Sequence, residues 1–343
     1  MKKKLGIAGA IVGAASAGVA GLALAKRYAV GRIRLRPDAE ASEPFGELRG
    51  REHTLTTSDG IELHVEIDGP EDAPLTIVLC HGYCLNLESW HYQRRDLRED
   101  FRLVLWDQRS HGRSQRAAAE DCTIDRLGDD LAEVIDTFVP GPCVLVGHSM
   151  GGMTIMALAD RRPELFGDKI RAVSLIATSA GKLAELTLGL PAMLSKVVHK
   201  VAPGAVSILG KRGSLVDKTR HAGSDIGFLI TRLVGFGDSR NVSPTVVDFA
   251  ESMIRATPTE VFANFYPALM NHDKLSALDV LVPVPTAILV GDKDWLTPPD
   301  HSKAIAAALP NARFVEVEDT SHLIQFERPT VVNEVLRDLI KEA

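Results

Sequence analysis

From residue 51 onward, short continuous apolar runs alternate with longer stretches in which apolar residues recur every three or four positions. The first pattern is typical of buried strands and the second of helices with one buried face. We expect strands at 75–80, 103–106, 143–146, 173–177 and 286–290, and an alternating one at 314–317. We expect helices between most of them, at 124–139, 150–161 and 299–309, and a closing helix at 330–341. This alternation predicts a mostly parallel sheet with helices on both faces.

Residues 51–69, REHTLTTSDGIELHVEIDG, follow a different pattern. Polar and apolar residues alternate on either side of Asp59-Gly60, a dipeptide that favours the tight turn of a β-hairpin. We therefore expect two antiparallel strands at the start of the domain. Together with the runs further along the chain, they predict an α/β fold with an eight-stranded, mostly parallel sheet.

The strand–helix alternation stops between about residue 180 and residue 275. This stretch holds helix-like segments rich in Leu, Val, Met and Phe, which are broken by several prolines and glycines. A structureless loop of this length is unusual in a compact domain. We therefore expect 180–275 to be a helical cap inserted into a core made of 51–179 and 276–343. Its place between two strands puts it over the carboxyl edge of the sheet, where such folds bind ligands.

The N-terminus carries a different signal. Residues 5–25 form a run of 21 positions without a charge, with basic residues on both sides, and such a run is long enough to cross a bilayer. We expect 1–25 to be a transmembrane or signal-anchor segment and 26–50, charged and broken by Pro37 and Pro44, to be a linker. The basic residues after the apolar run resist export, which favours a cytoplasmic globular domain. The alternative is secretion after cleavage of a signal peptide.

Charge and cysteine content exclude some functions. The formal net charge of −6 gives no electrostatic reason to expect binding of nucleic acid, so we expect no nucleic-acid partner. The four cysteines form no CxxC pair and have no histidines at metal-ligand spacing, so we expect neither a metal nor a cofactor. We interpret Cys80, Cys84, Cys122 and Cys143 as free thiols, mostly buried, with a nucleophilic Cys84 as the alternative.

One serine stands at a distinctive position. The strand expected at 143–146 runs directly into Gly147-His148-Ser149-Met150-Gly151, and a helix follows. The chain must turn sharply there, and the glycines at 147 and 151 let neighbouring backbone pass. The turn directs the Ser149 Oγ and the Met150 amide toward the same point above the sheet edge, with the positive end of the helix behind them. Ser149 is therefore a candidate nucleophile.

A serine hydroxyl needs a base to take its proton, and the chain offers partners in later loops. Asp292 and Asp294 follow the strand expected at 286–290, and His322 follows the strand expected at 314–317. Both loops leave the same sheet edge as Ser149. We expect His322 to be the general base and Asp294 to orient its imidazole, with Asp292 as the alternative acid.

Together these features resemble the α/β-hydrolase superfamily, and within it the cap-bearing serine hydrolases of the esterase, lipase and cofactor-free haloperoxidase type. The resemblance covers roughly residues 51–343. The family's nucleophile motif reads GHSMG at 147–151, its acid motif reads GDKD at 291–294, and its base is His322. Two further family motifs read HGY at 81–83 and DQRSHGRS at 107–114.

The resemblance implies a catalytic triad of Ser149, Asp294 and His322. It also implies that the Tyr83 amide is the second oxyanion donor beside that of Met150. Ser110 replaces the glycine that is usual in the motif at 107–114, a departure that concerns a structural loop and leaves the triad intact. His81, His111 and His148 we interpret as packing residues within the motif loops.

A serine nucleophile indicates acyl transfer, because the dehalogenases and epoxide hydrolases of this fold need a carboxylate at that position. We therefore expect an esterase or lipase-like hydrolase that acts on a small-molecule ester or lipid, since the expected cap is apolar. The alternatives are a cofactor-free perhydrolase or haloperoxidase, a C–C bond hydrolase with the same triad, and a ligand-binding receptor of the same fold. A membrane anchor would keep such an enzyme close to lipid substrates.

Overall fold

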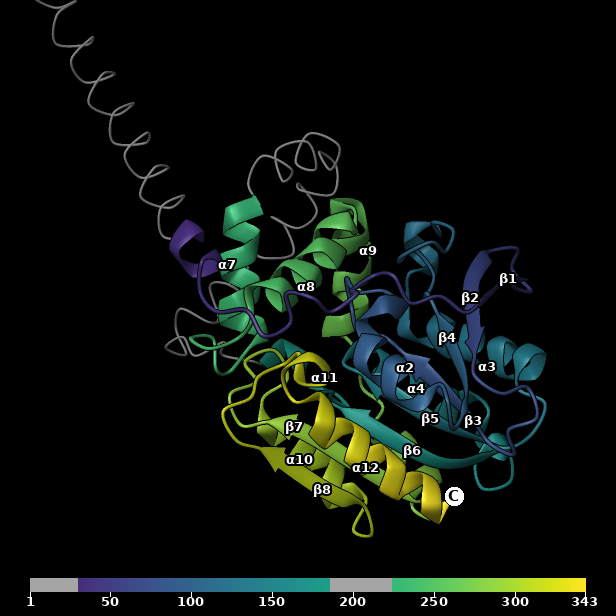
Figure 1. The fold of residues 1–343 in the computed structure, drawn as a ribbon. Coiled ribbons are helices and arrows are strands. Elements are labelled where there is room, and N and C mark those ends of the chain that lie inside the picture. Colours follow the sequence, from purple (N-terminus) through teal and green to yellow (C-terminus); the bar gives the residue numbers. More distant parts are fainter. Residues whose placement is uncertain (1–29, 186–223) are drawn as a thin grey trace, which may run out of the picture.

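The computed structural model describes residues 30–185 and 224–343, which fold around one twisted sheet (Figure 1). The strand order across the sheet is β1-β2-β4-β3-β5-β6-β7-β8. The strands are β1 (Arg51–Thr56), β2 (Glu62–Asp68), β3 (Thr76–Cys80), β4 (Arg102–Trp106), β5 (Cys143–His148), β6 (Ile170–Ile176), β7 (Thr286–Gly291) and β8 (Arg313–Val317). The expected eight-stranded sheet is thereby confirmed.

Strand directions also follow the prediction. β2 pairs antiparallel with both β1 and β4, and the pairs from β4 to β8 are parallel. The predicted hairpin turns at Asp59-Gly60, where Gly60 has a φ of 86° and donates its amide to the Thr57 carbonyl at 2.8 Å. Glycine adopts this left-handed conformation without steric cost, which explains its place in the turn. The sheet is therefore mixed only at its N-terminal edge.

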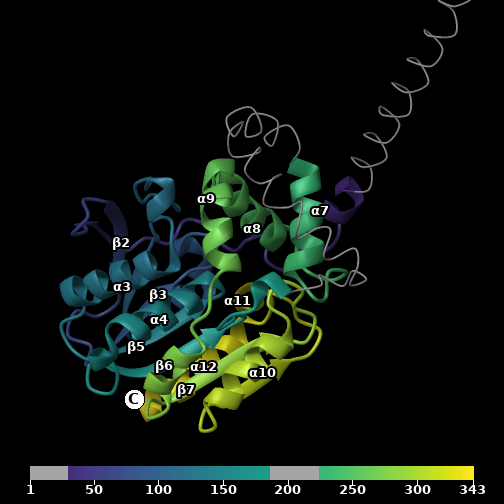
Figure 2. The same ribbon diagram turned by 180° about the vertical axis from the view of Figure 1, so that it is seen from behind.

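Helices cover both faces of the sheet, and Figures 1 and 2 show the molecule from opposite sides. One face packs against α3 (Ile124–Phe138), α4 (Met150–Arg161) and α10 (Pro299–Ala308), and the other against α2 (His91–Leu97), α11 (Ile324–Glu327) and α12 (Pro329–Glu342). Short 3-10 helices lie at Leu87–Trp90 (η1), Ala119–Asp121 (η2), Pro163–Leu165 (η3), Leu183–Glu185 (η4) and Ser276–Leu281 (η5).

The strand sequences explain this layering. Successive side chains of a strand point to opposite faces, so a continuous apolar run contributes to both cores. In β3, Val78 and Cys80 belong to the core under α3 and α4, whereas Ile77 and Leu79 belong to the core under α12. All four side chains are fully buried. Two hydrophobic cores thus hold the central strands in place and fix the positions at which their carboxyl ends emerge.

Three helices lie over the carboxyl edge of the sheet, where the cap was expected: α7 (Ser224–Gly235), α8 (Pro244–Ala256) and α9 (Thr259–Met270) (Figure 1). Contacts with the core hold them there. The Tyr83 hydroxyl donates to the Phe262 carbonyl of α9 at 2.6 Å, and the Leu323 amide donates to the Gly235 carbonyl of α7 at 2.9 Å. Residues 186–223 of the expected cap lie outside the described residues.

The segment 30–50, expected to be part of a linker, is docked on the cap and the core. Val30 is buried in an apolar cluster with α7 and α8, and the Phe45 ring stacks on Phe249 at 4.6 Å. Asp38 accepts a hydrogen bond from the Thr245 hydroxyl at 2.6 Å. These contacts hold residues 30–50 of the expected linker against the domain, because apolar side chains scattered among charged ones find their partners far along the chain.

The predicted membrane segment 1–25 and residues 26–29 lie outside the described residues. Within the part of the chain that the structure describes, no helix combines the length and the apolar character that a membrane crossing requires. The four cysteines are all free and buried, as expected for thiols that pack like small apolar side chains. Burial raises the pKa of Cys80 and of Cys143 to about 12, so both remain uncharged thiols.

Candidate active site

Ser149 lies in the sharp turn between β5 and α4. Its φ of 52° and ψ of −117° are unusual for a residue with a side chain, and such strain persists only where the surroundings enforce it. The Ser149 amide donates to the Ile176 carbonyl at 2.9 Å, and its carbonyl accepts from the Thr178 hydroxyl at 2.7 Å. Both ends of the residue are therefore fixed by β6 and the loop that follows it.

The glycines beside Ser149 make this turn possible. A side chain at position 147 would place its Cβ 2.6 Å from the backbone of Gly151 and Gly152. A Cβ at Gly151 would overlap the carbonyl oxygen of Cys80 at the end of β3. As the sequence predicts, the absence of side chains here allows α4 to start against two neighbouring strands.

His322 lies in the loop between β8 and α11 and faces two partners. Its Nδ1 is 2.9 Å from Oδ2 of Asp294, and its carbonyl accepts a hydrogen bond from Nε2 of His148 at 2.9 Å. The rings of His148 and His322 are 4.8 Å apart between centroids, so His322 lies beside the turn that carries Ser149. With Nδ1 donating to the carboxylate, Nε2 is the nitrogen left to accept a proton.

No direct hydrogen bond between the Ser149 hydroxyl and His322 is formed in the described part of the chain. Such a bond is often long in a site without substrate and shortens only when the substrate binds. The geometry thus brings the base and the acid into contact and leaves the serine next to them.

Asp294 is the carboxylate that contacts the histidine. It also accepts hydrogen bonds from the amides of Leu296 and Thr297 at 2.8 and 2.9 Å and from the Thr297 hydroxyl at 2.8 Å. Burial raises the pKa of Asp294, but the His322 ring and the Thr297 hydrogen bonds outweigh it, so the pKa lies below its ordinary value. The alternative acid, Asp292, is exposed and accepts the Thr320 amide at 3.1 Å.

Two backbone amides are available near Ser149. The Met150 amide is the first of α4, and the first amides of a helix have no partner within it. The loop with Tyr83 is equally close, because a Cβ at Gly82 would lie 3.2 Å from the Ser149 Cβ. Within residues 30–185 and 224–343, neither the Tyr83 nor the Met150 amide donates to another backbone carbonyl. Both can therefore donate to an oxyanion.

The motif histidines are buried and neutral. Burial, with the ring of His111 nearby, lowers the pKa of His81 to about 3, and its Nε2 accepts the Gln108 amide at 2.9 Å. Burial lowers the pKa of His148 to about 3 and that of His111 to about 4. Groups with such values do not exchange protons near neutral pH, which agrees with their interpretation as packing residues.

A second serine–histidine pair lies nearby and was not expected from the sequence. The hydroxyl of Ser179, in the loop after β6, lies 2.7 Å from Nδ1 of His301 and donates to the Gly181 carbonyl at 2.6 Å. Ser179 is completely buried, and its backbone is not in a left-handed conformation. Burial lowers the pKa of His301. The pair lacks the turn geometry and the bonded carboxylate found at Ser149 and His322.

Other residues that position the site were also missed. Thr297 holds Asp294 through its amide and its hydroxyl, and its spacing of three residues after an aspartate is a local signal that can be read from sequence. Thr178 and the Tyr83 hydroxyl contact groups far away in the chain, so no local pattern marks them.

The loop with the motif 107–114 is held by charged groups. The Asp107 carboxylate accepts the amides of Leu87 and Arg113, each at 2.8 Å. Ser110, which stands in place of the usual glycine, has a φ of 67° and accepts the Ala117 amide on its hydroxyl at 2.9 Å. That hydrogen bond offsets part of the cost of a side chain in the left-handed region.

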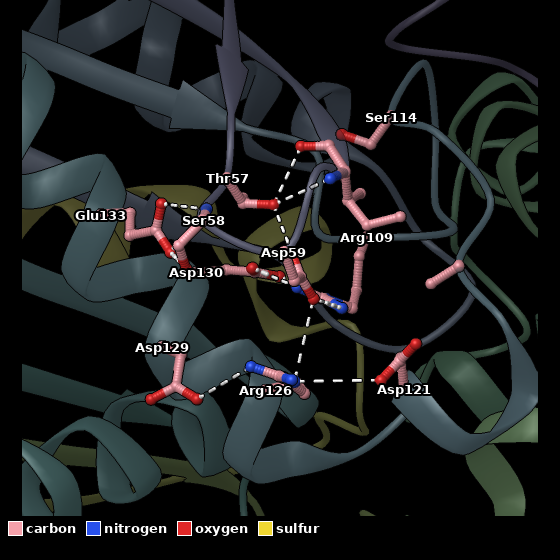
Figure 3. A network of polar contacts seen from close by, with 12 residues as sticks. Thr57, Ser58, Asp59, Arg109, Ser114, Asp121, Arg126, Asp129, Asp130 and Glu133 are labelled. Atoms are coloured by element: carbon pink, nitrogen blue, oxygen red, sulfur yellow. Dashed lines mark hydrogen bonds and ion pairs between the residues drawn. The ribbon is translucent and has the colours of Figure 1, made fainter.

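Arg109 extends from the same loop into a polar network (Figure 3). Its guanidinium forms two hydrogen bonds with Asp130 of α3, at 2.6 and 2.7 Å, and two with Asp59 of the hairpin turn, at 3.0 and 3.3 Å. Arg126 lies at the outer side of this network, 3.8 Å from Asp59. The network ties the hairpin, the motif loop and α3 together, away from Ser149.

One group of residues has the composition of a metal site. Possible ligand atoms of Glu52, His64 and Glu66 lie within 4.8 Å of one another. The Glu66 carboxylate, however, is already bonded to the guanidinium groups of Arg94 and Arg113. Its negative charge is thus compensated by arginines, and the cluster does not suit a cation.

Known proteins resemble this chain along most of its length. The proline iminopeptidase PfmaB of Pestalotiopsis fici is 27% identical over 83% of this chain and 98% of its own length. The 3-oxoadipate enol-lactonase 1 of Acinetobacter baylyi is 26% identical over 84% of this chain and 96% of its own. A thermophilic esterase from Thermogutta terrifontis is 26% identical and superimposes with a TM-score of 0.65, over 85% of this chain and 99% of its own.

These relatives are hydrolases whose names differ in substrate. The family model described as alpha/beta hydrolase fold matches residues 76–329, which include the turn at Ser149 and the loops of Asp294 and His322. That match spans most of the chain and agrees with the observed sheet. The chain therefore belongs to the alpha/beta hydrolase fold family, and it is a hydrolase by that membership.

Proposed function

We propose that this protein is a serine hydrolase that cleaves carboxylic esters, with Ser149 as nucleophile, His322 as base and Asp294 as the acid that orients it. The observation that carries the proposal is the hydrogen bond between His322 Nδ1 and the buried Asp294 carboxylate, next to the strained turn of Ser149. Oriented in this way, the imidazole keeps Nε2 free for proton transfer.

The reaction follows from these positions. His322 Nε2 takes the proton of the Ser149 hydroxyl as its oxygen attacks the ester carbonyl, and the Tyr83 and Met150 amides stabilise the oxyanion. The imidazolium, stabilised by the Asp294 carboxylate, then protonates the departing alcohol. A water molecule, deprotonated by His322, attacks the acyl-enzyme, releases the acid and restores the serine.

An ester or lactone fits this mechanism better than an epoxide, because an alkyl-enzyme ester requires a carboxylate where this chain has Ser149. The names of the enol-lactonase and esterase relatives support that choice of substrate class. The apolar residues of α7, α8 and α9 over the sheet edge favour substrates with an uncharged or acyl-chain part. We propose that the cap comprises 180–275 and selects these substrates.

A fluorophosphonate probe tests the nucleophile, because only an activated serine attacks its phosphorus at a useful rate. We expect labelling of Ser149 and loss of both labelling and ester hydrolysis in Ser149→Ala. Ser179→Ala is the matched control, since Ser179 also lies beside a histidine after a strand of the sheet. Labelling that persists in Ser149→Ala and disappears in Ser179→Ala would contradict the proposal.

A series of esters with increasing acyl-chain length then defines the substrate. We expect turnover to depend on Ser149 for every ester of the series. Peracid formation from the acid and hydrogen peroxide, in preference to ester hydrolysis, would indicate the perhydrolase alternative. Binding of these esters without turnover would indicate a receptor.

We also propose that residues 1–25 anchor the protein in a membrane with the hydrolase domain on the cytoplasmic side. The support is the uncharged run 5–25 and the basic residues that follow it. Full-length protein should sediment with membranes and resist extraction by alkaline carbonate. Recovery of the intact chain in the soluble fraction would contradict the anchor, and recovery outside the cell with Lys26 at the N-terminus would indicate a cleaved signal peptide.

A further inference from the structure

Helix α7 exposes an apolar face. Ile226, Ile230 and Leu233 are 52%, 56% and 65% exposed, and their spacing of four and three residues places them on one side of the helix. A helix on the surface of a soluble domain ordinarily presents polar residues there. Adjacent exposed apolar side chains of this size mark an interaction surface.

Packing against the other residues that the structure describes does not account for these side chains. The opposite face of α7 carries Phe228, which is completely buried in a cluster with Val246 and Val247 of α8. Contacts of the inner face thus hold α7 on the cap, and the side chains of the outer face are not needed for this attachment. The outer face remains available for a partner.

The N-terminal segment lies against this helix. Residues 30–34 are helical and lie beside α7 in both views (Figures 1 and 2). The Arg34 guanidinium lies over the Phe228 ring at 4.9 Å and 3.7 Å from the Asp225 carboxylate. Leu35, which follows directly, is 86% exposed. The chain therefore reaches its uncharged N-terminal run from a point next to α7.

The distance from that run to α7 is short. Five residues lead from Ala25, where the uncharged run ends, to Val30, and a chain of this length spans at most about 18 Å. If 5–25 crosses a bilayer, α7 must lie near the bilayer surface. An apolar helix face at that distance matches the interfacial layer of phospholipids, into which apolar side chains insert.

We propose that the outer face of α7, formed by Ile226, Ile230 and Leu233, inserts into the surface of a phospholipid bilayer. The proposal rests on the membrane association proposed above and adds an orientation to it. The anchor alone determines that the domain lies near the membrane, whereas a second contact determines which side of the domain faces the lipid.

This orientation brings the active-site loops toward the membrane. The last turn of α7 is bonded to the loop of His322, because the Ser321 hydroxyl donates to the Val234 carbonyl at 2.8 Å and the Leu323 amide donates to the Gly235 carbonyl at 2.9 Å. If α7 lies on the lipid surface, the loop of His322 at the C-terminal end of α7 lies close to the lipid. An acyl chain would then reach the active site from that side.

A single fluorescent label on the full-length protein tests the contact. The four native cysteines are buried, so Ile230→Cys labelled with a nitrobenzoxadiazole dye reports on one position. With vesicles of phosphatidylcholine and phosphatidylglycerol, we expect its emission to shift to the blue and to be quenched by spin-labelled lipid. The matched control is Lys341→Cys, at an exposed position of α12 near the C-terminus, where we expect neither change.

The outcomes separate this proposal from the others. A label at position 230 that stays unquenched with vesicles overturns it, even if the enzyme is active on esters. A label that is already blue-shifted in buffer also overturns it, because a second copy or another segment then covers the face. Lipid quenching in a protein without esterase activity supports the α7 contact and contradicts the proposed function instead.

A variant extends the test to turnover. In Ile226→Ser/Ile230→Ser/Leu233→Ser we expect hydrolysis of a long-chain ester in vesicles to fall about tenfold, since insertion of three aliphatic side chains is lost. Hydrolysis of a short soluble ester should be unchanged, because the three side chains are exposed on the outer face of α7 and belong to neither of the apolar clusters that α7, α8 and α9 form over the sheet edge. Equal rates of variant and wild type on the vesicle ester would overturn the proposal.

Discussion

Two buried carboxylates in this protein, Asp294 and Asp130, have partners of different kinds. Asp294 bonds to the imidazole of His322, a group whose two ring nitrogens can donate and accept protons. Asp130 bonds to Arg109, whose guanidinium remains charged under all ordinary conditions. The pair of Asp294 and His322 can therefore take part in proton transfer, whereas the pair of Asp130 and Arg109 can only stabilise the structure.

The surroundings of the two pairs differ in the same sense. His322 lies beside the turn of Ser149, the residue that we propose as nucleophile. Arg109 is enclosed between Asp130 and Asp59, and all its neighbours in Figure 3 belong to loops and to α3. Burial alone therefore does not distinguish the pair that we propose to be catalytic from the structural pair. The partner of the carboxylate, a histidine in one pair and an arginine in the other, does distinguish them.

The largest expected effect breaks the first pair. Asp294→Asn should lower turnover of a short ester by roughly 10²–10⁴, because the imidazole then favours the wrong tautomer. The free energy of unfolding in urea should change little in this variant. Asp292→Asn is the control and should retain nearly full turnover, since its carboxylate is exposed and bonds only to backbone. If the control lost activity and Asp294→Asn did not, the acid would be Asp292.

Breaking the second pair should affect folding instead. Arg109→Met leaves Asp130 and Asp59 without their main partner, and removal of one member of a buried ion pair costs about 3–5 kcal/mol. We expect this loss in the free energy of unfolding in urea, with turnover per folded molecule unchanged. Arg126→Met, which removes a largely exposed arginine from the same network, should cost about 1 kcal/mol or less. Similar losses of unfolding free energy in Arg109→Met and Arg126→Met would contradict the expectation that the buried arginine contributes more to stability.

The stability of the fold at acid pH provides a further test of the network around Arg109. Burial raises the pKa of Asp59, but hydrogen bonds with Arg109 and Thr57 lower it more, to about 2 against an ordinary value of 3.8. Because the folded pKa is the lower one, Asp59 stabilises the fold above pH 4 and this contribution is lost as the pH falls toward 2. Asp59→Asn should therefore flatten that part of the stability profile, measured by thermal unfolding. An unchanged profile would argue against the network.

The smallest effect concerns the contact between Tyr83 and helix α9. Tyr83→Phe removes the hydrogen bond to the Phe262 carbonyl, a loss of about 1 kcal/mol in stability. We expect KM for long-chain esters to rise more than kcat falls, because the amide of Tyr83 stays while α9 is held less firmly. Tyr266→Phe, on the same helix, serves as the control. A drop in kcat alone would instead indicate that the hydroxyl acts in the reaction.

The fold could be predicted because its signals are local. The apolar runs of β3 and β5 and the Asp59-Gly60 turn each extend over only a few residues, and the structure confirms the sheet that they indicate. Ser149, Asp294 and His322 were candidates for a related reason: each follows a strand, and strands of one sheet end at one edge.

What could not be predicted depends on contacts between distant residues. Asp38 and Thr245 are separated by 207 positions, and neither carries a local pattern that indicates their hydrogen bond. The pair of Ser179 and His301 is equally invisible in sequence, since serine and histidine are common and 122 positions lie between them. Tertiary packing determines such contacts, and composition does not indicate which residues will form them.

The docking of residues 30–50 determines where the chain can be shortened. A version that begins after the apolar and basic N-terminus but keeps Val30 retains the cover of α7 and α8. A version that begins near Glu47 lacks both Val30 and Phe45, so Phe249 loses its stacked ring and the cap cluster opens to water. The shortest form of this protein that keeps the cap cluster intact for crystallisation therefore starts some twenty residues before β1. A choice based on the predicted strands alone would have removed these residues.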